Sequence, residues 1–277
     1  MNYNYYLKTE PGYVVAFLDI LGFSALINNN DTVALNSPGF TYNFPPICKF
    51  ITSRYMPEKQ AELGIKFLWV SDSIFITAKQ ENIQVLLQEM REVIHQLFCT
   101  NLSARGGIAT GSLYFETNLW GTAVVNAVGL EKIASMPRII MQKSDFEQLK
   151  PIMALETNFW HAEDDYYCFD YFERFFSERT EAQSDLESLL SVYARCIQEN
   201  FEDANDTRIR QKWSYLAKCF QKNIIKNREY INSHTAYAKE RASAFDIDTE
   251  NMEHTDIYLS IIHDAANYTE GEQSWTS

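Results

Sequence analysis

The pattern of hydrophobic and polar positions predicts a mixed α+β protein. Two apolar runs rich in valine, isoleucine and phenylalanine, at residues 14–18 and 67–77, are typical of strands buried on both faces. Apolar residues spaced three or four apart over 81–98 predict a helix that packs one face on the sheet. The other elements expected up to residue 171 are a short helix beginning near 23, an irregular loop over 28–46, a helix over 47–63, a strand beginning at 105, a helix over 121–134, a strand at 137–141, a helix at 144–149 and a strand at 166–171.

The chain after residue 180 has a different pattern. Apolar residues recur at helical spacing over 180–245, and more weakly over 256–266, without a strict seven-residue repeat. This pattern favours packed helices over a coiled coil. We therefore expect a catalytic domain at 12–172 and a helical C-terminal extension at 180–277, which either packs on the domain or builds a dimer.

Asp19 is a carboxylate at the end of an apolar strand. An unpaired charge buried there would cost several kcal/mol, so Asp19 needs a partner. One interpretation is that Asp19 caps the helix expected near Phe23. The other is that it holds a cation.

A second carboxylate, Asp72, interrupts the second apolar run between Ser71 and Ser73. Two strands joined at this point would form a hairpin with Asp72 in its turn. If the hairpin pairs with the strand that ends at Asp19, two carboxylates meet. Paired aspartate oxygens are typical ligands of Mg²⁺ or Mn²⁺.

Charge and composition narrow the classes of partner. The formal net charge is −13, and no basic stripe is recognised, so we expect neither nucleic acid nor an anionic membrane as a partner. No apolar run is long enough to span a bilayer and no signal peptide is recognised, so we expect a cytoplasmic protein. The five cysteines have no metal-site spacing and indicate free thiols: Cys48, Cys99, Cys168, Cys196 and Cys219.

Four short blocks resemble the motifs of class III nucleotide cyclases, in the order of that family. They are Asp-Ile-Leu-Gly-Phe-Ser at 19–24, Val-Ser-Asp-Ser at 70–73, Arg-Gly-Gly-Ile-Ala-Thr-Gly at 105–111 and the segment 118–131 that ends in Leu-Glu. The resemblance implies a ferredoxin-like catalytic domain, an α/β sandwich, and a homodimer with active sites between the protomers. It also implies two Mn²⁺ or Mg²⁺ ions per site and attack of a ribose 3′-hydroxyl on the α-phosphorus of a nucleoside triphosphate.

The resemblance also implies roles for particular residues. The metal ligands are Asp19, Ile20 and Asp72, with the two aspartates as the catalytic pair. The residues that bind substrate are Gly22, Phe23, Leu68, Arg105 and Asn118. For Arg105 two interpretations stay open: a contact to the nucleotide or site wall, or a bulge permitted by the glycines that follow it.

The sequence also departs from the family pattern. Val125 and Gly129 stand where purine cyclases have their transition-state asparagine and arginine, and Asn126 lies one position away. Leu68 and Asn118 replace the lysine and aspartate that read a purine. The chain therefore resembles most the pyrimidine cyclases of bacterial Pycsar anti-phage systems, which implies that it converts UTP to cyclic UMP, read by a separate effector. The alternatives are a cytidylate cyclase, then an adenylate or guanylate cyclase, or a degenerate nucleotide-binding module.

Overall fold

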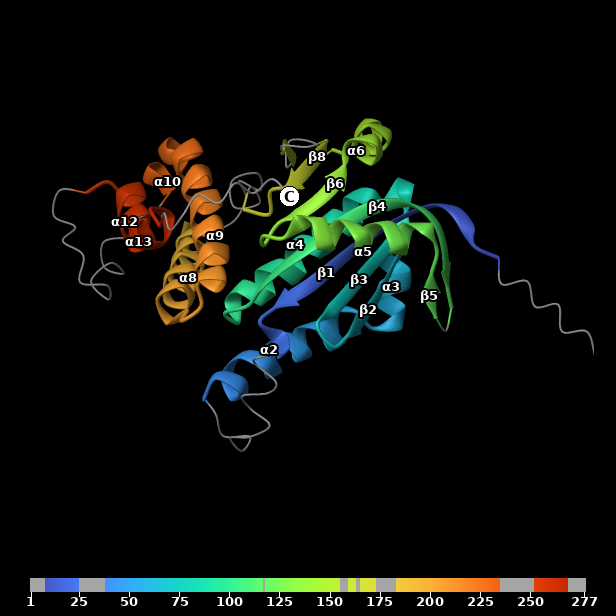
Figure 1. Cartoon of the computed structure of the whole chain (residues 1–277), viewed down its shortest axis with the longest axis horizontal. Helices are drawn as coiled ribbons and strands as arrows, with labels where there is room; N and C mark the ends of the chain where they lie inside the picture. Colours follow the sequence, from blue (N-terminus) through green and yellow to red (C-terminus); the bar gives the residue numbers. More distant parts are fainter. Residues whose placement is uncertain are drawn as a thin grey trace, which may run out of the picture. The chain divides into compact units, whose positions relative to one another are not determined.

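A computed structural model describes residues 8–24, 38–116, 118–154, 159–162, 165–172, 183–234 and 252–268. The chain divides into two compact units, residues 1–171 and 172–277, and Figure 1 shows the elements of both. The first unit contains the sheet. The described part of the second unit contains helices and no strand.

An eight-stranded sheet forms the first unit. Its strands lie in the order β2-β3-β1-β4-β6-β8-β7, and β5 pairs with the end of β4 outside this row. β4 and β6 are parallel, and the other pairs are antiparallel. The strands are β1 (Glu10–Leu21), β2 (Ile65–Val70), β3 (Ser73–Lys79), β4 (Ser103–Phe115), β5 (Leu119–Trp120), β6 (Ile139–Gln142), β7 (Phe159–His161) and β8 (Tyr166–Phe169).

The order β2-β3-β1-β4, with helices between β1 and β2 and between β3 and β4, is the ferredoxin-like arrangement. This confirms the predicted fold class. The helices of the first unit are α2 (Pro38–Arg54), α3 (Pro57–Leu63), η1 (Gln80–Asn82), α4 (Ile83–Cys99), α5 (Thr122–Ala134), α6 (Lys143–Leu149) and η2 (Lys150–Ile152).

Helices cover the sheet on both faces. Side chains alternate along β1, so Ala16 and Leu18 project to one face, while Phe17 and Asp19 project to the other. α4 contacts β1, β3 and β4, and the alternating pattern of buried residues assigns it to the face of Leu18. α5 packs on the face of Phe17, and Figure 1 shows it crossing β1 and β4. Asp19 therefore lies on the α5 side of the sheet.

α5 rests directly on β4. A side chain at Gly107 would collide with the carbonyl oxygen of Ala127 and the Cβ of Leu130. The ladder between β1 and β4 keeps its register here, with Asp19 opposite Arg105 and Phe17 opposite Gly107. The predicted alternative of a bulge at Arg105 is therefore wrong, because Gly107 admits the backbone of α5 instead.

Several elements differ from the prediction. α2 begins at Pro38, inside the expected loop, and the single helix expected over 47–63 is two helices. The break follows from Pro57, because the residue before a proline avoids helical backbone, and Met56 is extended with φ −62° and ψ 151°. β5 and β7, which are two and three residues long, were not predicted. The continuation of the helix expected near Phe23 lies outside the described residues.

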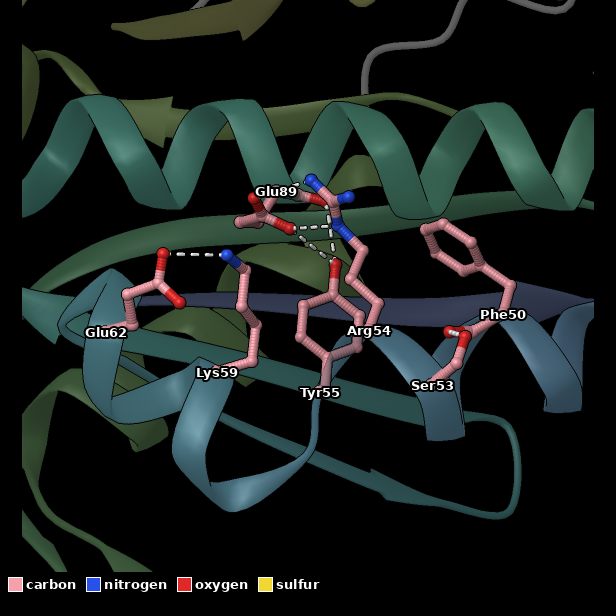
Figure 2. A network of polar contacts seen from close by, with 7 residues as sticks. All are labelled: Phe50, Ser53, Arg54, Tyr55, Lys59, Glu62 and Glu89. Atoms are coloured by element: carbon pink, nitrogen blue, oxygen red, sulfur yellow. Dashed lines mark hydrogen bonds and ion pairs between the residues drawn. The ribbon is translucent and has the colours of Figure 1, made fainter.

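A partly buried ion pair ties α2 to α4 (Figure 2). The Arg54 guanidinium donates to both carboxylate oxygens of Glu89, from Nε at 2.6 Å and from Nη2 at 2.8 Å. The Tyr55 hydroxyl donates to Glu89 Oε2 at 3.0 Å, and burial, followed by the neighbouring Glu89 charge, raises the pKa of Tyr55. Tyr55 thus stays a donor, and all three side chains form one network.

The same network covers β2, the edge strand of the sheet. The Tyr55 ring stacks on Phe67 with centroids 3.9 Å apart. Gln60 on α3 donates from Nε2 to the Tyr55 carbonyl and accepts a hydrogen bond at Oε1 from the Phe67 backbone N–H at 2.8 Å. α3 thereby satisfies a backbone donor on the outer side of β2.

We expect Arg54→Met to lower the free energy of unfolding by about 2 kcal/mol, since it leaves the buried Glu89 carboxylate without its cation; one-third exposure of Arg54 reduces the effect through solvent screening. Lys59→Met is the matched control, because the Lys59–Glu62 pair in Figure 2 is exposed on both sides. It should change the free energy by no more than about 0.5 kcal/mol. Urea denaturation followed by circular dichroism measures both, and equal losses would contradict the assignment.

The second unit is built from α8 (Gln183–Asp203), α9 (Thr207–Lys226), α10 (Arg228–His234), α12 (His254–Ile261) and α13 (His263–Ala266). α8 and α9 pack together around buried apolar residues such as Leu190, Leu216 and Phe220. α9 contradicts the expectation that the chain has no basic stripe. It contains no acidic residue, and exposed lysines recur at every fourth position, Lys218, Lys222 and Lys226.

Two further expectations concern the whole chain. All five cysteines lie in the described ranges and are free thiols, as predicted. Across the described helices, none combines the length and apolar character that crossing a membrane requires.

Candidate active site

Asp19 lies near the end of β1, between two neighbouring strands. Its antiparallel partners are Ser73 on β3 and Arg105 on β4. Cross-strand partners project to the same face, so all three side chains point to the α5 side. The Asp19 side chain is 21% exposed. The predicted buried carboxylate is therefore half-buried and accessible from this face.

Asp72 occupies a two-residue turn beside Asp19. β2 ends at Val70 and β3 begins at Ser73, with Ser71 in the left-handed region at φ 58°. The Ile20 N–H donates to the Asp72 carbonyl at 2.8 Å, and the Ser73 hydroxyl donates to Asp72 Oδ1 at 3.4 Å. The predicted hairpin is confirmed, and its turn lies next to the end of β1.

Arg105 joins Asp19 to a third acidic residue. Its Nε lies 3.1 Å from Asp19 Oδ2 and 2.6 Å from Glu131 Oε1 on α5. The Glu131 side chain is only 8% exposed and belongs to the buried face of α5 with Ala127 and Leu130. Burial raises the pKa of the Glu131 carboxyl, Arg105 opposes this shift, and Asp19 adds to it.

The donor set at the end of β1 suits a hard divalent cation. Asp19 and Asp72 offer carboxylate oxygens, which Mg²⁺ and Mn²⁺ prefer. The N–H and C=O of a strand residue project to the same side, so the Ile20 carbonyl faces the turn that carries Asp72. In the part of the chain that the structure describes, no three His, Cys, Asp or Glu side chains are arranged to hold a metal. Backbone, substrate or water oxygens would have to complete the coordination.

Gly22 and Phe23 follow directly on β1. Gly22 has φ +81°, a conformation that favours glycine, and it turns the chain away from the strand. Phe23 is buried. Helical backbone is described only at Phe23 and Ser24, so the predicted phosphate-binding helix N-terminus lies largely outside the described residues.

Leu68 and Asn118 lie on different parts of the sheet from Asp19. Leu68 pairs with Phe75, two strands away from β1, and is half-buried. Asn118 is exposed beyond the end of β4, and Arg105 and Phe115 are ten positions apart on that strand. At about 3.3 Å per residue this separation is roughly 30 Å. One chain therefore does not bring Asn118 to its own Asp19.

Lys66 contacts the end of β4, and this contact was not predicted. Its ammonium group lies 4.9 Å from the centroid of the Phe115 ring and donates to the Phe115 carbonyl. Lys66 shares a face of β2 with Leu68, and Phe115 is three residues before Asn118. The sequence indicated which residues of β2 share a face. It did not indicate that β5 pairs back on the end of β4.

Val125 and Gly129 lie on the outer side of α5. Val125 is 70% exposed, and a Cβ added at Gly129 meets no atom within 4 Å. The helix is continuous from Thr122 to Ala134, so Asn126 lies about 100° around the helix from Val125. Any group at positions 125 and 129 faces away from Asp19 of the same chain.

Among the solved structures that resemble this chain are two of bacterial light-regulated adenylyl cyclases. The first is 15% identical with a TM-score of 0.42, and the match covers 59% of this chain and 53% of the other. The second is 17% identical with a TM-score of 0.37, and the match covers 57% of this chain and 90% of the other. The chain thus spans about half the length of the first. No protein-family model and no curated protein match the sequence.

Proposed function

We propose that this protein is a nucleotide cyclase that forms a 3′,5′-cyclic monophosphate and pyrophosphate from a nucleoside triphosphate. The observation that carries the proposal is the meeting of two carboxylate-bearing backbone segments. Asp19 lies opposite Ser73, and the Asp72 carbonyl accepts from Ile20. The two segments thus bring the carboxylate-bearing residues Asp19 and Asp72 to adjacent strand ends, where carboxylate and carbonyl oxygens suit a hard divalent cation.

In this proposal Asp19, Asp72 and the Ile20 carbonyl hold two Mg²⁺ or Mn²⁺ ions. Such ions lower the pKa of an attacking hydroxyl and stabilise the charge of leaving phosphates. Arg105 lies on the same face as Asp19, and its planar guanidinium suits a phosphate. Gly22 and Phe23 would contribute backbone N–H groups to the phosphates.

The proposed enzyme works as a homodimer. Asn118 and positions 125 and 129 point away from, or lie far from, Asp19 of the same chain. They can contribute only to a site on another copy. Exposed apolar side chains support association on this face: Val125 and Ile133 on α5 and Trp120 on β5.

The base is proposed to be uracil. Leu68 gives the pocket an apolar wall, and Asn118 offers a neutral amide that can donate or accept. Lys66 adds a donor that suits the uracil O4 acceptor and does not suit the cytosine amino group at that position. UTP is therefore favoured over CTP, and the product, cyclic UMP, would signal to a separate effector in anti-phage defence.

A second candidate function is a nucleotide-binding module without turnover. Two observations favour it: Arg105 already pairs with Asp19, and Val125 presents no polar group where the resemblance expects an asparagine. This alternative still requires the pair Asp19 and Asp72 to bind a metal–nucleotide complex.

Incubation of the full chain with ATP, GTP, CTP and UTP separately, in the presence of Mn²⁺, tests these proposals. Mass spectrometry of the products should find cyclic UMP and pyrophosphate from UTP. Cyclic CMP alone would overturn the choice of uracil, and efficient cyclic AMP or GMP would overturn the pyrimidine assignment. Binding of a triphosphate without any product would support the non-catalytic module.

A further inference from the structure

Arg105 is held at one end of its guanidinium. The shortest contacts to Asp19 and to Glu131 both involve Nε, at 3.1 and 2.6 Å. Its Nε–H donates a hydrogen bond to Asp19 Oδ2, whereas no hydrogen bond from Nη1 or Nη2 to another described residue is found. The Arg105 side chain is 29% exposed. The two terminal nitrogens thus present a fork that is suited to bidentate binding of a phosphate.

Glu131 is an acceptor without a well-aligned donor. Its Oε1 is fully buried and, within the described ranges, accepts no hydrogen bond of acceptable geometry, although Arg105 Nε lies only 2.6 Å away. A single N–H cannot point at two carboxylates at once, and here it points at Asp19. A buried carboxylate oxygen left in this state is costly, so a state in which Glu131 Oε1 accepts a hydrogen bond is favoured.

A cation at Asp19 would change this balance. Asp19 would then no longer need the guanidinium, and repulsion from the cation would weaken the Asp19–Arg105 pair. Without another anchor, Arg105 would lose its orientation. Glu131 already lies within contact distance of Nε, so a small rotation of the Nε–H toward Glu131 Oε1 gives the guanidinium a new partner without moving α5 or β4.

We infer that Glu131 is a positioning residue: it retains Arg105 by Nε when Asp19 binds a cation, and so aims the two terminal nitrogens of Arg105 at the triphosphate. This inference rests on the proposed function and adds to it a residue that does not touch the substrate. It predicts that Glu131 controls phosphate affinity rather than the chemical step.

The test is isothermal titration calorimetry of the full chain with inorganic tripolyphosphate in the presence of Mn²⁺, a measurement that needs no turnover. Glu131→Gln keeps the shape of the side chain and removes its charge. We expect it to weaken tripolyphosphate binding at least tenfold, and to change the affinity for Mn²⁺ alone less than threefold. Where cyclic nucleotide is formed, KM for the triphosphate should rise about tenfold with kcat within threefold.

Three variants define the alternatives. Glu147→Gln removes the same charge from an exposed residue on α6 and should bind tripolyphosphate like the wild type. Arg105→Lys keeps the charge without the fork and should lose as much affinity as Glu131→Gln. Glu131→Asp, which keeps the negative charge on a shorter side chain, should lose less affinity than Glu131→Gln. Circular dichroism confirms that each variant is folded.

Unchanged tripolyphosphate binding by Glu131→Gln would overturn the inference even if the protein is a cyclase. An equally large loss of affinity for Mn²⁺ alone would also overturn it, because Glu131 would then be a metal ligand. The expected loss in a protein that forms no cyclic nucleotide would support the inference and reject the proposed enzyme.

Discussion

Asp19→Ala and Asp72→Ala should each lower cyclic nucleotide formation by roughly 1,000-fold or more, because each removes a ligand of the ions that would stabilise the transition-state charge. The fold should survive. In Asp19→Ala, Arg105 keeps its contact with Glu131, and Asp72 lies in an accessible turn, so each change in unfolding free energy should stay within about 1 kcal/mol. Product formation and urea denaturation of each variant measure the two effects.

Asp145→Ala is the matched control. Asp145 on α6 accepts hydrogen bonds from the Thr110 N–H at 3.1 Å and the Thr110 hydroxyl at 2.7 Å, so its role is to join α6 to β4. Its loss should lower the free energy of unfolding by about 1–3 kcal/mol and leave turnover per folded molecule unchanged. If Asp19→Ala instead behaves like Asp145→Ala, Asp19 is a structural residue, as the helix-cap interpretation would have it.

The double substitution Val125→Asn with Gly129→Arg should raise turnover about 10- to 100-fold, as expected for added groups that stabilise transition-state charge. The resemblance assigns these two positions to an asparagine and an arginine, and both are free to accept larger side chains. Val125 is 70% exposed, and the space around Gly129 is open. Replacing a glycine inside a helix should also stabilise α5 by up to about 1 kcal/mol. Steady-state kinetics with the preferred triphosphate measures the gain.

Asn126→Ala is the control for this prediction. If α5 were shifted by one residue, Asn126 would take the role of the missing asparagine, and its removal would abolish turnover. Because α5 is continuous, its register is not shifted and Asn126 does not take the place of residue 125. We therefore expect Asn126→Ala to leave turnover within about twofold, as for other surface substitutions. A double variant no faster than the wild type would show that other groups already fill both roles.

The meeting of the segments that carry Asp19 and Asp72 was predictable from a local turn signal together with the fold that the resemblance implies. A two-residue turn follows from Ser71-Asp72, and the β1–β3 pairing follows from the ferredoxin-like order. α5 was expected over 121–134 and is observed at Thr122–Ala134.

The contacts that connect distant segments were not predictable. Glu131 was visible as the last residue of a motif, but its contact with Arg105 depends on how closely α5 lies on β4, which Gly107 decides. A carboxylate next to Ala127 and Leu130 on the buried side of a helix was the available signal. Lys66 offered no such signal in the sequence, because its contact with Phe115 depends on the path of the chain at the end of β4.

The break between α2 and α3 was missed because proline has two roles at helix ends. Pro57 is compatible with the first turn of a helix, so a proline inside a polar segment does not reveal by itself whether a helix stops there or starts there. The lysines of α9 were missed because the net charge of −13 sums acidic and basic segments of the whole chain. Counting charge one helix at a time would have found them.

The cover that α3 gives to β2 bears on the proposed homodimer. An uncovered edge strand invites another strand to extend the ladder, and such growth has no natural end. Here the Phe67 N–H already donates to Gln60, Tyr55 stacks on the Phe67 ring, and the opposite edge strand, β7, spans three residues. Sheet extension past β2 would have to displace this cover first. Association through the α5 face, as proposed, would leave the cover on β2 in place. In a two-fold symmetric dimer each copy buries the same surface, so the assembly ends at two copies.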